Sequence, residues 1–225
     1  MCSGRLSLTV AVDVVLFAVQ QKRLYTLLVE RGRPPFQGMW AFPGGMVEPD
    51  EPLVAAACRE LAEETGIRDV PYLTQLRTFG DPHRDPRGRV ISVVYWGLTP
   101  ELVPPRGADD AAKAQWWPVD AVPALAFDHQ AILTCARHHL CREVQRDLRL
   151  LFHLLPPPFV LRELQEVYEV ITGRPTDKRN FRRYVLQHPW LEELGIRAPQ
   201  GPGRPARQYR PRPEALVPSP GDQCV

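Results

Sequence analysis

The sequence is poor in cysteine and has no long apolar run. Its five cysteines are odd in number and include no C-x-x-C pair, so neither a disulfide framework nor a zinc site is indicated, and reduced thiols are the simplest expectation. The most apolar stretch, residues 6–19, is short, carries Asp13 and alternates like a strand. This pattern argues against a signal peptide or a membrane span. We therefore expect a cytoplasmic protein that makes no use of a membrane.

Net charge is also small, at +2, but it is unevenly distributed. Residues 1–151 hold 17 basic and 18 acidic side chains, whereas residues 174–212 hold ten basic and three acidic ones. Such an asymmetry indicates an anionic partner for the second half of the chain.

Proline, in contrast, is abundant, and many of the 25 prolines fall at residues 156–158 and 199–220. Because proline-rich stretches punctuate a chain, they indicate its organisation. We predict a first domain over residues 1–143, a second over residues 144–212 and a disordered tail over residues 213–225.

The most informative stretch is GMVEPDEPLVAAACRELAEETGI, residues 45–67. Pro52 suits the first position of a helix and Gly66 a position just past its end, so the spacing predicts a helix of about 13 residues. At about 100° per residue, three glutamates share one narrow arc, and an apolar set fills the neighbouring arc and is expected to face a core. The glutamates are Glu60, Glu63 and Glu64; the apolar set is Val54, Ala57, Cys58 and Leu61.

Three clustered carboxylates repel one another unless a cation joins them, and Mg²⁺ prefers a few carboxylate oxygens together with waters and substrate phosphates. Mn²⁺ could take the same place. Arg59 lies beside the arc and can hold one carboxylate by two hydrogen bonds. The preceding Gly44 and Gly45 read as a loop whose backbone approaches a phosphate or offers a carbonyl to the metal. The alternative is a solvated acidic face, but that does not account for the specific residue types at so many positions of residues 45–67.

The remainder of the first half predicts a mixed sheet with helices on its faces. Alternating and apolar runs indicate strands, two of them joined as a hairpin, and one helix follows the last strand. The strands are expected at residues 6–14, 24–30, near 40, 73–79, 90–98 and around 116–117, and the helix from about residue 127 to 140.

Three further groups in this half are site candidates, each with an alternative. Loop residues 81–89 are either a solvated hairpin loop or a ligand loop, in which Arg84 or Arg87 would hold a phosphate or ribose and Asp81 or Asp85 would accept a hydroxyl or bind metal. The pair at positions 109 and 110, both Asp, forms either a surface turn or a further metal ligand. His129 is either a residue at a helix start or an acid or base.

The second half predicts a winged helix-turn-helix. Helices are expected over residues 142–155, 161–171 and 177–187, with the last two joined by a turn at Thr172–Pro175, and two short strands flank a glycine- and proline-rich segment. Phe181, Tyr184 and Val185 lie on one arc of the third helix and are expected to pack. The opposite arc and the wing would meet double-stranded DNA through Lys178, Arg179, Arg182, Arg183, Arg204 and Arg207. The alternative is a charged appendage that only packs or dimerises.

The residues 45–67 match the pattern G-x5-E-x7-R-E-apolar-x-E-E-x-G-apolar at every position, which identifies the chain as a member of the Nudix superfamily. The resemblance implies an α/β/α sandwich. It also implies that Glu60 and Glu64 are the principal Mg²⁺ ligands, that Glu63 is a further ligand or the base, that Gly44 or Gly45 lends a carbonyl, and that Arg59 orients Glu60 or Glu63. The run DPHRDPRGRVISVVY, residues 81–95, resembles proteins related to ADP-ribose pyrophosphatases, which makes Arg84 and Asp85 the candidates for substrate binding.

The second half, through LLPPPFVLRELQEVYEVITGRPTDKRNFRR and GRPARQYR, resembles the Nudix-related transcriptional regulators of NAD biosynthesis. That resemblance implies a homodimer that binds operator DNA and whose DNA affinity changes with ADP-ribose. Many members of that family have a degenerate box and have lost hydrolysis, whereas this chain keeps every catalytic position. We therefore expect a Mg²⁺-dependent hydrolase of ADP-ribose or a related nucleoside diphosphate derivative fused to a DNA-binding domain. The alternatives are a regulator that only senses ADP-ribose and an enzyme whose second domain only dimerises.

Overall fold

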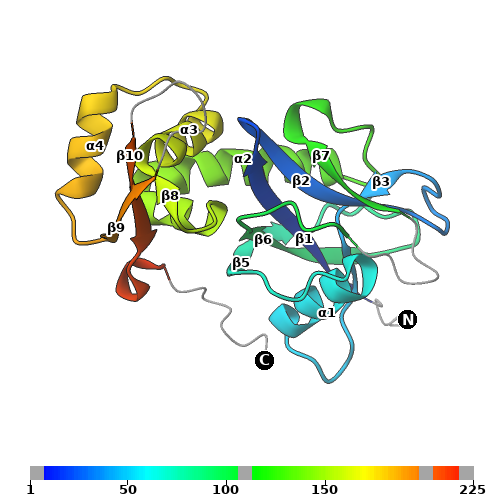
Figure 1. Cartoon of the computed structure of the whole chain (residues 1–225). Coiled ribbons are helices and arrows are strands. Elements are labelled where there is room, and N and C mark those ends of the chain that lie inside the picture. Colours follow the sequence, from blue (N-terminus) through cyan, green and yellow to red (C-terminus); the bar gives the residue numbers. More distant parts are fainter. Residues whose placement is uncertain (1–7, 106–112, 198–204, 218–225) are drawn as a thin grey trace, which may run out of the picture.

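The computed structural model describes residues 8–105, 113–197 and 205–217. Its first half is a mixed seven-stranded sheet, built around the parallel pair β1 and β6 (Figure 1). β1 also forms the predicted hairpin with β2, and β5 lies on the other side of β6. The strands are β1 Thr9–Gln20, β2 Arg23–Glu30, β3 Trp40–Ala41, β4 Gly44–Met46, β5 Tyr72–Phe79, β6 Val90–Leu98 and β7 Ala114–Pro118.

A helix covers each face of this sheet, as the alternation of side chains along its strands requires. Val12 and Val14 of β1 pack with Leu61 of α1, Leu53–Thr65, whereas Val15 of β1 packs in a second cluster with Ile132 of α2, His129–Arg146. Because successive residues of one strand enter different cores, the architecture is the α/β/α sandwich that the sequence predicted.

The termini of α1 also agree with the prediction. Pro52, expected as the first helical residue, is the N-cap, so the helix begins one residue later, and Gly66 is the C-cap with φ of +74°, a left-handed conformation that favours glycine. Two local expectations are wrong. Gly44 and Gly45 belong to β4, which pairs with β1, rather than to a loop, and Cys58 is disulfide-bonded rather than reduced. Cys135 and Cys141 are free thiols.

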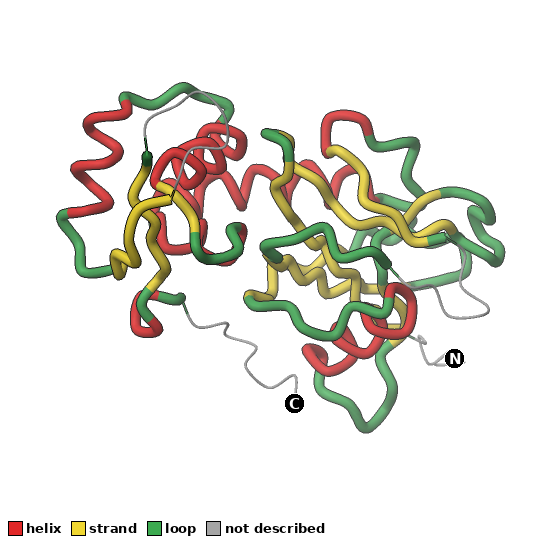
Figure 2. The backbone as a smooth tube through the Cα atoms, viewed as in Figure 1, coloured by secondary structure: helices red, strands yellow, loops and turns green. Residues whose placement is uncertain are grey.

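The second half is the predicted winged helix-turn-helix, with a small sheet in the order β8–β10–β9 (Figure 2). Buried leucines and aromatic residues of this half continue the core cluster on the α2 side of the first sheet. The elements are β8 Phe159–Val160, α3 Leu161–Thr172, α4 Lys178–Leu186, β9 Leu191–Arg197 and β10 Ala206–Pro211, and the 3-10 helices of the chain are Val119–Ala121, Leu148–Leu154 and Pro213–Ala215.

The connection between the halves differs from the prediction. A single helix over residues 142–155 does not form, because α2 continues to Arg146 and a 3-10 helix begins at Leu148. Between them Asp147 is extended and its side chain accepts a hydrogen bond from the Arg149 N–H, which caps the new helix. The domain boundary expected after residue 143 therefore falls inside α2.

The tail expected from residue 213 is ordered where it starts. Residues 213–215 form a 3-10 helix in which Ala215 is buried, and the His153 Nε2–H donates to the Val217 carbonyl oxygen over 3.0 Å. Residues 218–225 lie outside the described part of the chain. Within that described part, every helix is too short or too polar to cross a bilayer.

Candidate functional site

The glutamate face of α1 lies against the two glycines of β4. Glu60 and Glu64 are four residues apart and so share one face of the helix. The Gly44 N–H donates to Glu64 Oε2 over 3.0 Å, and a Cβ on Gly45 would lie 2.2 Å from Glu60 Oε1. A side chain at position 45 would displace the Glu60 carboxylate, because Glu60 occupies the space that a Cβ would fill.

Arg59 joins the carboxylates of this face. It holds Glu51 by two hydrogen bonds, Nη2 to Oε1 at 2.7 Å and Nε to Oε2 at 3.1 Å, and its Nη1 reaches Glu60 at 2.9 Å and Glu63 at 3.3 Å. Contacts with Glu60 and Glu63 were expected. The two-bond partner, however, is Glu51, which the sequence marked only as a position of the motif.

Burial perturbs the acids of this site. It raises the pKa of Glu64 to about 7, helped by the charges of Glu60 and Asp13 and opposed by the Gly44 N–H. Burial also raises the pKa of Glu60, against the lowering effect of Arg59. Two carboxylates are thus held close together in a desolvated place where an oxygen-binding cation would stabilise their charged forms.

The three glutamates do not converge on one point. Glu63 lies about 100° around the helix from Glu64, its side chain is 60% exposed, and it contacts Arg59. Among the described residues no group of three or more His, Cys, Asp or Glu side chains lies close enough to hold a metal. The donor set that fits a divalent cation is therefore Glu60 and Glu64 beside Gly45, with coordination positions left for water and phosphate.

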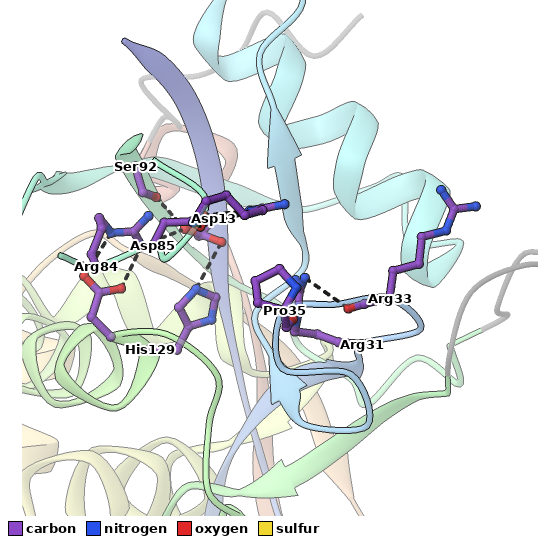
Figure 3. Close-up of polar contacts among 10 residues, drawn as sticks. Asp13, Arg31, Arg33, Pro35, Arg84, Asp85, Ser92 and His129 are labelled. Carbon is purple, nitrogen blue, oxygen red and sulfur yellow. Dashed lines mark hydrogen bonds and ion pairs between the residues drawn. The ribbon is translucent and has the colours of Figure 1, made fainter. Parts of the chain in front are cut away.

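A buried polar network surrounds Asp13 on the sheet (Figure 3). Asp13 of β1 accepts a short hydrogen bond from the Ser92 hydroxyl and lies 3.5 Å from His129 Nε2 and 3.7 Å from Arg84 Nη2. Arg84 in turn holds Asp128 at 2.7 and 3.0 Å. No sequence pattern indicated that the two aspartates and the serine lie together, because they come from separate strands and loops.

His129 begins α2, as one of its two interpretations expected. Its Nδ1 accepts the Phe42 N–H over 3.0 Å, so Nε2 carries the proton that faces Asp13. Burial lowers the pKa of His129, despite the raising effect of Asp13. The ring is thus a neutral structural hydrogen-bonding group, and its position does not favour an acid or base. Asp109 and Asp110, the other candidates, lie outside the described residues.

The predicted substrate residues Arg84 and Asp85 are both buried. The Arg84 side chain is 4% exposed and is occupied by Asp128 and Asp13. Asp85 holds Arg87 through contacts of 2.6 and 3.0 Å, which lower the pKa of Asp85 against the opposing effect of its burial. The side chains of Arg84 and Asp85 are therefore engaged by protein partners, whereas Arg87, the alternative in this loop, remains half-exposed.

Two arginines and two aromatic rings form a further cluster, which we call the arginine-phenylalanine cluster: Arg31, Arg87, Phe36 and Phe127. The guanidinium carbons of Arg31 and Arg87 lie 4.6 and 5.7 Å from the centre of the Phe127 ring, and Phe36 meets that ring edge-on at 4.8 Å. Phe36 and Phe127 have positive φ angles of +60° and +52°. Residues with such strained backbone conformations are often found at ligand-binding sites.

Electrostatics places this cluster beside the acids. Burial and the charge of Arg87 lower the pKa of Arg31, while Asp85, Glu64 and Asp13 raise it. Two cations that repel each other next to a carboxylate site suit a bound anion. From the sequence, the segment from Arg31 to Gln37, with its paired prolines, was expected to be a connecting loop. Its residues did not predict the arginine-phenylalanine cluster.

The recognition surface of the second half lies on α4. Lys178, Arg179, Arg182 and Arg183 are all exposed, as predicted, while Phe181 and Val185 are buried. Tyr184 was expected to pack but is 44% exposed, and its ring lies 5.1 Å from that of His188. On the helix Tyr184 is about 60° from Phe181 and about 100° from Val185, at the edge of the buried face.

The turn before α4 is held by hydrogen bonds from α3. Gly173 has φ of +66° and ends α3, and Glu169 Oε1 accepts from the Thr176 N–H at 2.8 Å and from Gln165 at 2.9 Å. Gln165 also donates to the Thr176 carbonyl oxygen. The recognition helix is thus fixed relative to its neighbour.

The wing supplies less free charge than predicted. Arg207 donates to both oxygens of Glu193 on the adjacent strand at 2.8 Å. A phosphate would have to compete with this ion pair. Arg204 lies outside the described residues.

Comparison with known proteins agrees with the two-part organisation. The NUDIX domain model matches residues 7–135, and the NrtR DNA-binding winged helix domain model matches residues 151–210. The chain is 37% identical over 203 residues to the ADPR responsive transcriptional repressor NtrR of Acinetobacter baylyi, covering 88% of this chain and 80% of that protein. It is 39% identical over 127 residues to the ADP-ribose pyrophosphatase of Methanocaldococcus jannaschii, covering 55% and 70%.

Among solved structures, Shewanella oneidensis NrtR complexed with a 27mer DNA superposes with a TM-score of 0.78 at 35% identity, over 92% of this chain and 94% of that one. An intact Nudix motif, the sandwich that carries it and the appended winged helix thus agree with both domain models. The chain therefore belongs to the Nudix family and, within it, to the NrtR-type proteins that carry a DNA-binding winged helix domain.

Proposed function

We propose that this chain is a Mg²⁺-dependent hydrolase of ADP-ribose or a closely related nucleoside diphosphate derivative, and that it also binds operator DNA as a homodimer in a manner that depends on ADP-ribose. The observation that carries the enzymatic part is the placement of Glu60 and Glu64 on the glycines of β4, beside Arg59. Buried carboxylates with raised pKa values, next to paired arginines, support a site for a cation and a diphosphate.

Each part of the site has a distinct task in this proposal. Glu60 and Glu64, with a backbone oxygen at Gly45, would hold the cation, and Mn²⁺ could replace Mg²⁺. The cation would neutralise the diphosphate and lower the pKa of water. Glu63, an exposed acid on the same helix in contact with Arg59, would be a further ligand or the base, while Arg59 orients the carboxylates.

The arginine-phenylalanine cluster would bind the rest of the substrate. The guanidinium of Arg87, fixed by Asp85, can donate to phosphate oxygens, and Arg31 lies beside it. The rings of Phe36 and Phe127 offer an apolar surface to a ribose or a base. Hydrolysis would transfer the phosphoryl group of the anhydride to water, so that ADP-ribose would give AMP and ribose 5-phosphate.

The test is turnover of ADP-ribose by the full chain with and without Mg²⁺. We expect Glu64→Gln to reduce kcat/KM about 1,000-fold, because the site would lose an interaction that stabilises transition-state charge by several kcal/mol. Glu101→Gln removes the same charge from an exposed position and should have no effect. Equal turnover by the Glu64→Gln variant would refute the site.

A regulator that only senses ADP-ribose is the second candidate, because the relative that spans most of the chain is named a repressor. That function predicts no Mg²⁺-dependent turnover, but a shift in DNA affinity when ADP-ribose is added. An effector must bind the DNA-competent and incompetent states with different affinity. Unchanged DNA binding across a titration with ADP-ribose would remove the regulatory part, and a monomer at the concentrations that bind DNA would remove the homodimer.

A further inference from the structure

The packing of α4 defines which side chains point away from the protein. Phe181 and Val185 are the buried residues of this helix. At about 100° per residue, the direction opposite to them falls on Arg183, with Asn180 about 60° to one side, whereas Lys178 lies about 140° from Arg183. Arg179 lies about 40° from Arg183 on the other side, so Arg179, Asn180 and Arg183 share the outermost face, whereas Lys178 lies on the side of Val185 at the start of the helix.

Of these three outermost residues, Asn180 and Arg183 are joined to each other. Arg183 Nη2 donates to Asn180 Oδ1 over 3.1 Å. Asn180 is itself anchored, because its backbone N–H donates to the Asp177 side chain at 2.8 Å in the cap of α4. The pair presents the amide NH₂ of Asn180 and the remaining N–H groups of Arg183 as a fixed row of donors.

The other cations of this half differ in their contacts. Lys178, Arg179 and Arg182 are exposed and have no ion pair or hydrogen bond from their side chains within the described residues. In the wing, Arg210 donates to Glu192 at 2.8 Å, and Arg207 is paired with Glu193. Three classes result: a prearranged donor pair, free cations and cations that already have a counter-charge.

On the basis of the proposed DNA binding, we propose that Asn180 and Arg183 read base edges in the major groove, with Arg183 on a guanine, while Lys178 and Arg182 contact phosphates. Guanine offers O6 and N7 as adjacent acceptors that match a guanidinium. Because Asn180 Oδ1 already accepts from Arg183, its NH₂ group donates to an acceptor on the neighbouring base. Flexible lysine without a fixed partner suits a phosphate, which carries no sequence information.

The experiment uses the full chain and a library of duplexes with a randomised core. After selection, the affinity of the preferred duplex is compared with that of each single-base substitution, at several salt concentrations. We expect Arg183→Lys to lose about 5- to 150-fold of discrimination at one guanine while keeping the salt slope, since lysine keeps the charge but cannot donate to two acceptors at once. Asn180→Ala should weaken discrimination at the adjacent position.

Lys178→Ala is the matched control on the same helix. It should weaken binding to all duplexes alike and reduce the salt slope by about 1. Far-UV circular dichroism and the thermal midpoint should stay unchanged in all three variants, because all three side chains are exposed.

Retained discrimination in both Arg183→Lys and Asn180→Ala would overturn the assignment, and so would altered base preference in Lys178→Ala. If the unaltered protein selects no particular duplex from the library, the proposed operator binding is refuted, and with it the base contacts of Asn180 and Arg183. Turnover of ADP-ribose is independent of each of these results and separates them from failure of the enzymatic proposal.

Discussion

The acidic face of α1 and the basic face of α4 handle charge in opposite ways. On α1, Arg59 pairs with three carboxylates, and the side chains of Glu51 and Glu60 are only 14% and 13% exposed. On α4, Lys178 and Arg182 are exposed and, within the described residues, without a counter-ion. In Figure 1, α4 lies at the left and α1 at the lower right.

This difference reflects the two kinds of partner that the faces suit. A small hard cation needs a few oxygens held in advance, and burial makes those oxygens costly unless other groups compensate them. A polyanion releases counter-ions when free cations meet it, so exposed and unpaired charge is an advantage. Substitutions near α1 should therefore lower the free energy of unfolding, because the side chains there are buried. Substitutions on α4 should change DNA binding and leave the free energy of unfolding unaltered.

The largest effect should come from the buried network beside α1. Arg84→Ala would leave Asp13 and Asp128 without their cation, and we expect the free energy of unfolding to fall by about 3–5 kcal/mol. Urea unfolding measures this change. Arg146→Ala, which breaks an exposed pair with Glu143, should cost less than about 1 kcal/mol. An equal loss in free energy of unfolding for the two variants would contradict the difference between buried and exposed charges.

A pH dependence should follow from the raised pKa of Glu64. Between the ordinary value of 4.5 and about 7, the metal-free folded protein retains a proton that the unfolded chain has lost. The free energy of unfolding should therefore fall as pH rises through this window, by roughly 3 kcal/mol in total for this group. Urea unfolding at several pH values tests the sign. In Glu64→Gln this part of the dependence should disappear, while Mg²⁺ binding to the unaltered protein should strengthen with pH.

A smaller effect is expected where the backbone meets the acids. Gly45→Ala would place a methyl group where Glu60 now lies, and the displaced carboxylate should weaken Mg²⁺ affinity about 10- to 100-fold. Titration calorimetry measures the affinity. Gly80→Ala is the control, because its Cβ would meet its nearest neighbour at 3.7 Å, an ordinary contact. Unchanged affinity in Gly45→Ala would exclude this glycine from the metal site.

The smallest effect should come from an exposed link between the two halves. Lys22, at the tip of the β1–β2 hairpin, lies 3.4 Å from Glu166 of α3, and its side chain is 65% exposed. A double-mutant cycle with Lys22→Ala and Glu166→Ala should give a coupling of about 0.2–1 kcal/mol that decreases with added salt. A coupling of several kcal/mol would show that an exposed ion pair can contribute as much to stability as a buried one, contrary to the difference between the two regions.

Local patterns predicted the elements well where one segment carries the whole signal. The ends of α1 follow from Pro52 and Gly66 to within one residue, and the mixed sheet follows from the alternating run of β1 and the apolar run of β6, while the resemblance to Nudix proteins implied the α/β/α layers. The prediction over residues 142–155 was wrong because leucines spaced three or four apart suit both an α-helix and a 3-10 helix. The two helices are separated by the cap at Asp147, which depends on one side chain and does not change the spacing of the leucines.

The candidate site was predictable only in its contiguous part. Glu60, Glu63, Glu64 and Arg59 stand within one helix, so their spacing revealed them. The loop Arg84–Arg87 was found, but the sequence could not tell which of its charges is buried: Arg84 and Asp85 turned inwards because Asp128 and Arg87 are their partners. Tyr184 was assigned to the packed face because a helical wheel does not show how far the neighbouring elements extend over it.

The sequence by itself determined that a cluster of acids lies on one helix, that a basic helix follows a glycine turn and that the two belong to separate folding patterns, because each of these depends on spacing within a short segment. Only the tertiary structure decided which charges are compensated. Asp13, Arg31 and Phe127 are remote in the chain, and their effect on Glu64 and on one another depends on distance and burial, which chain folding alone brings about.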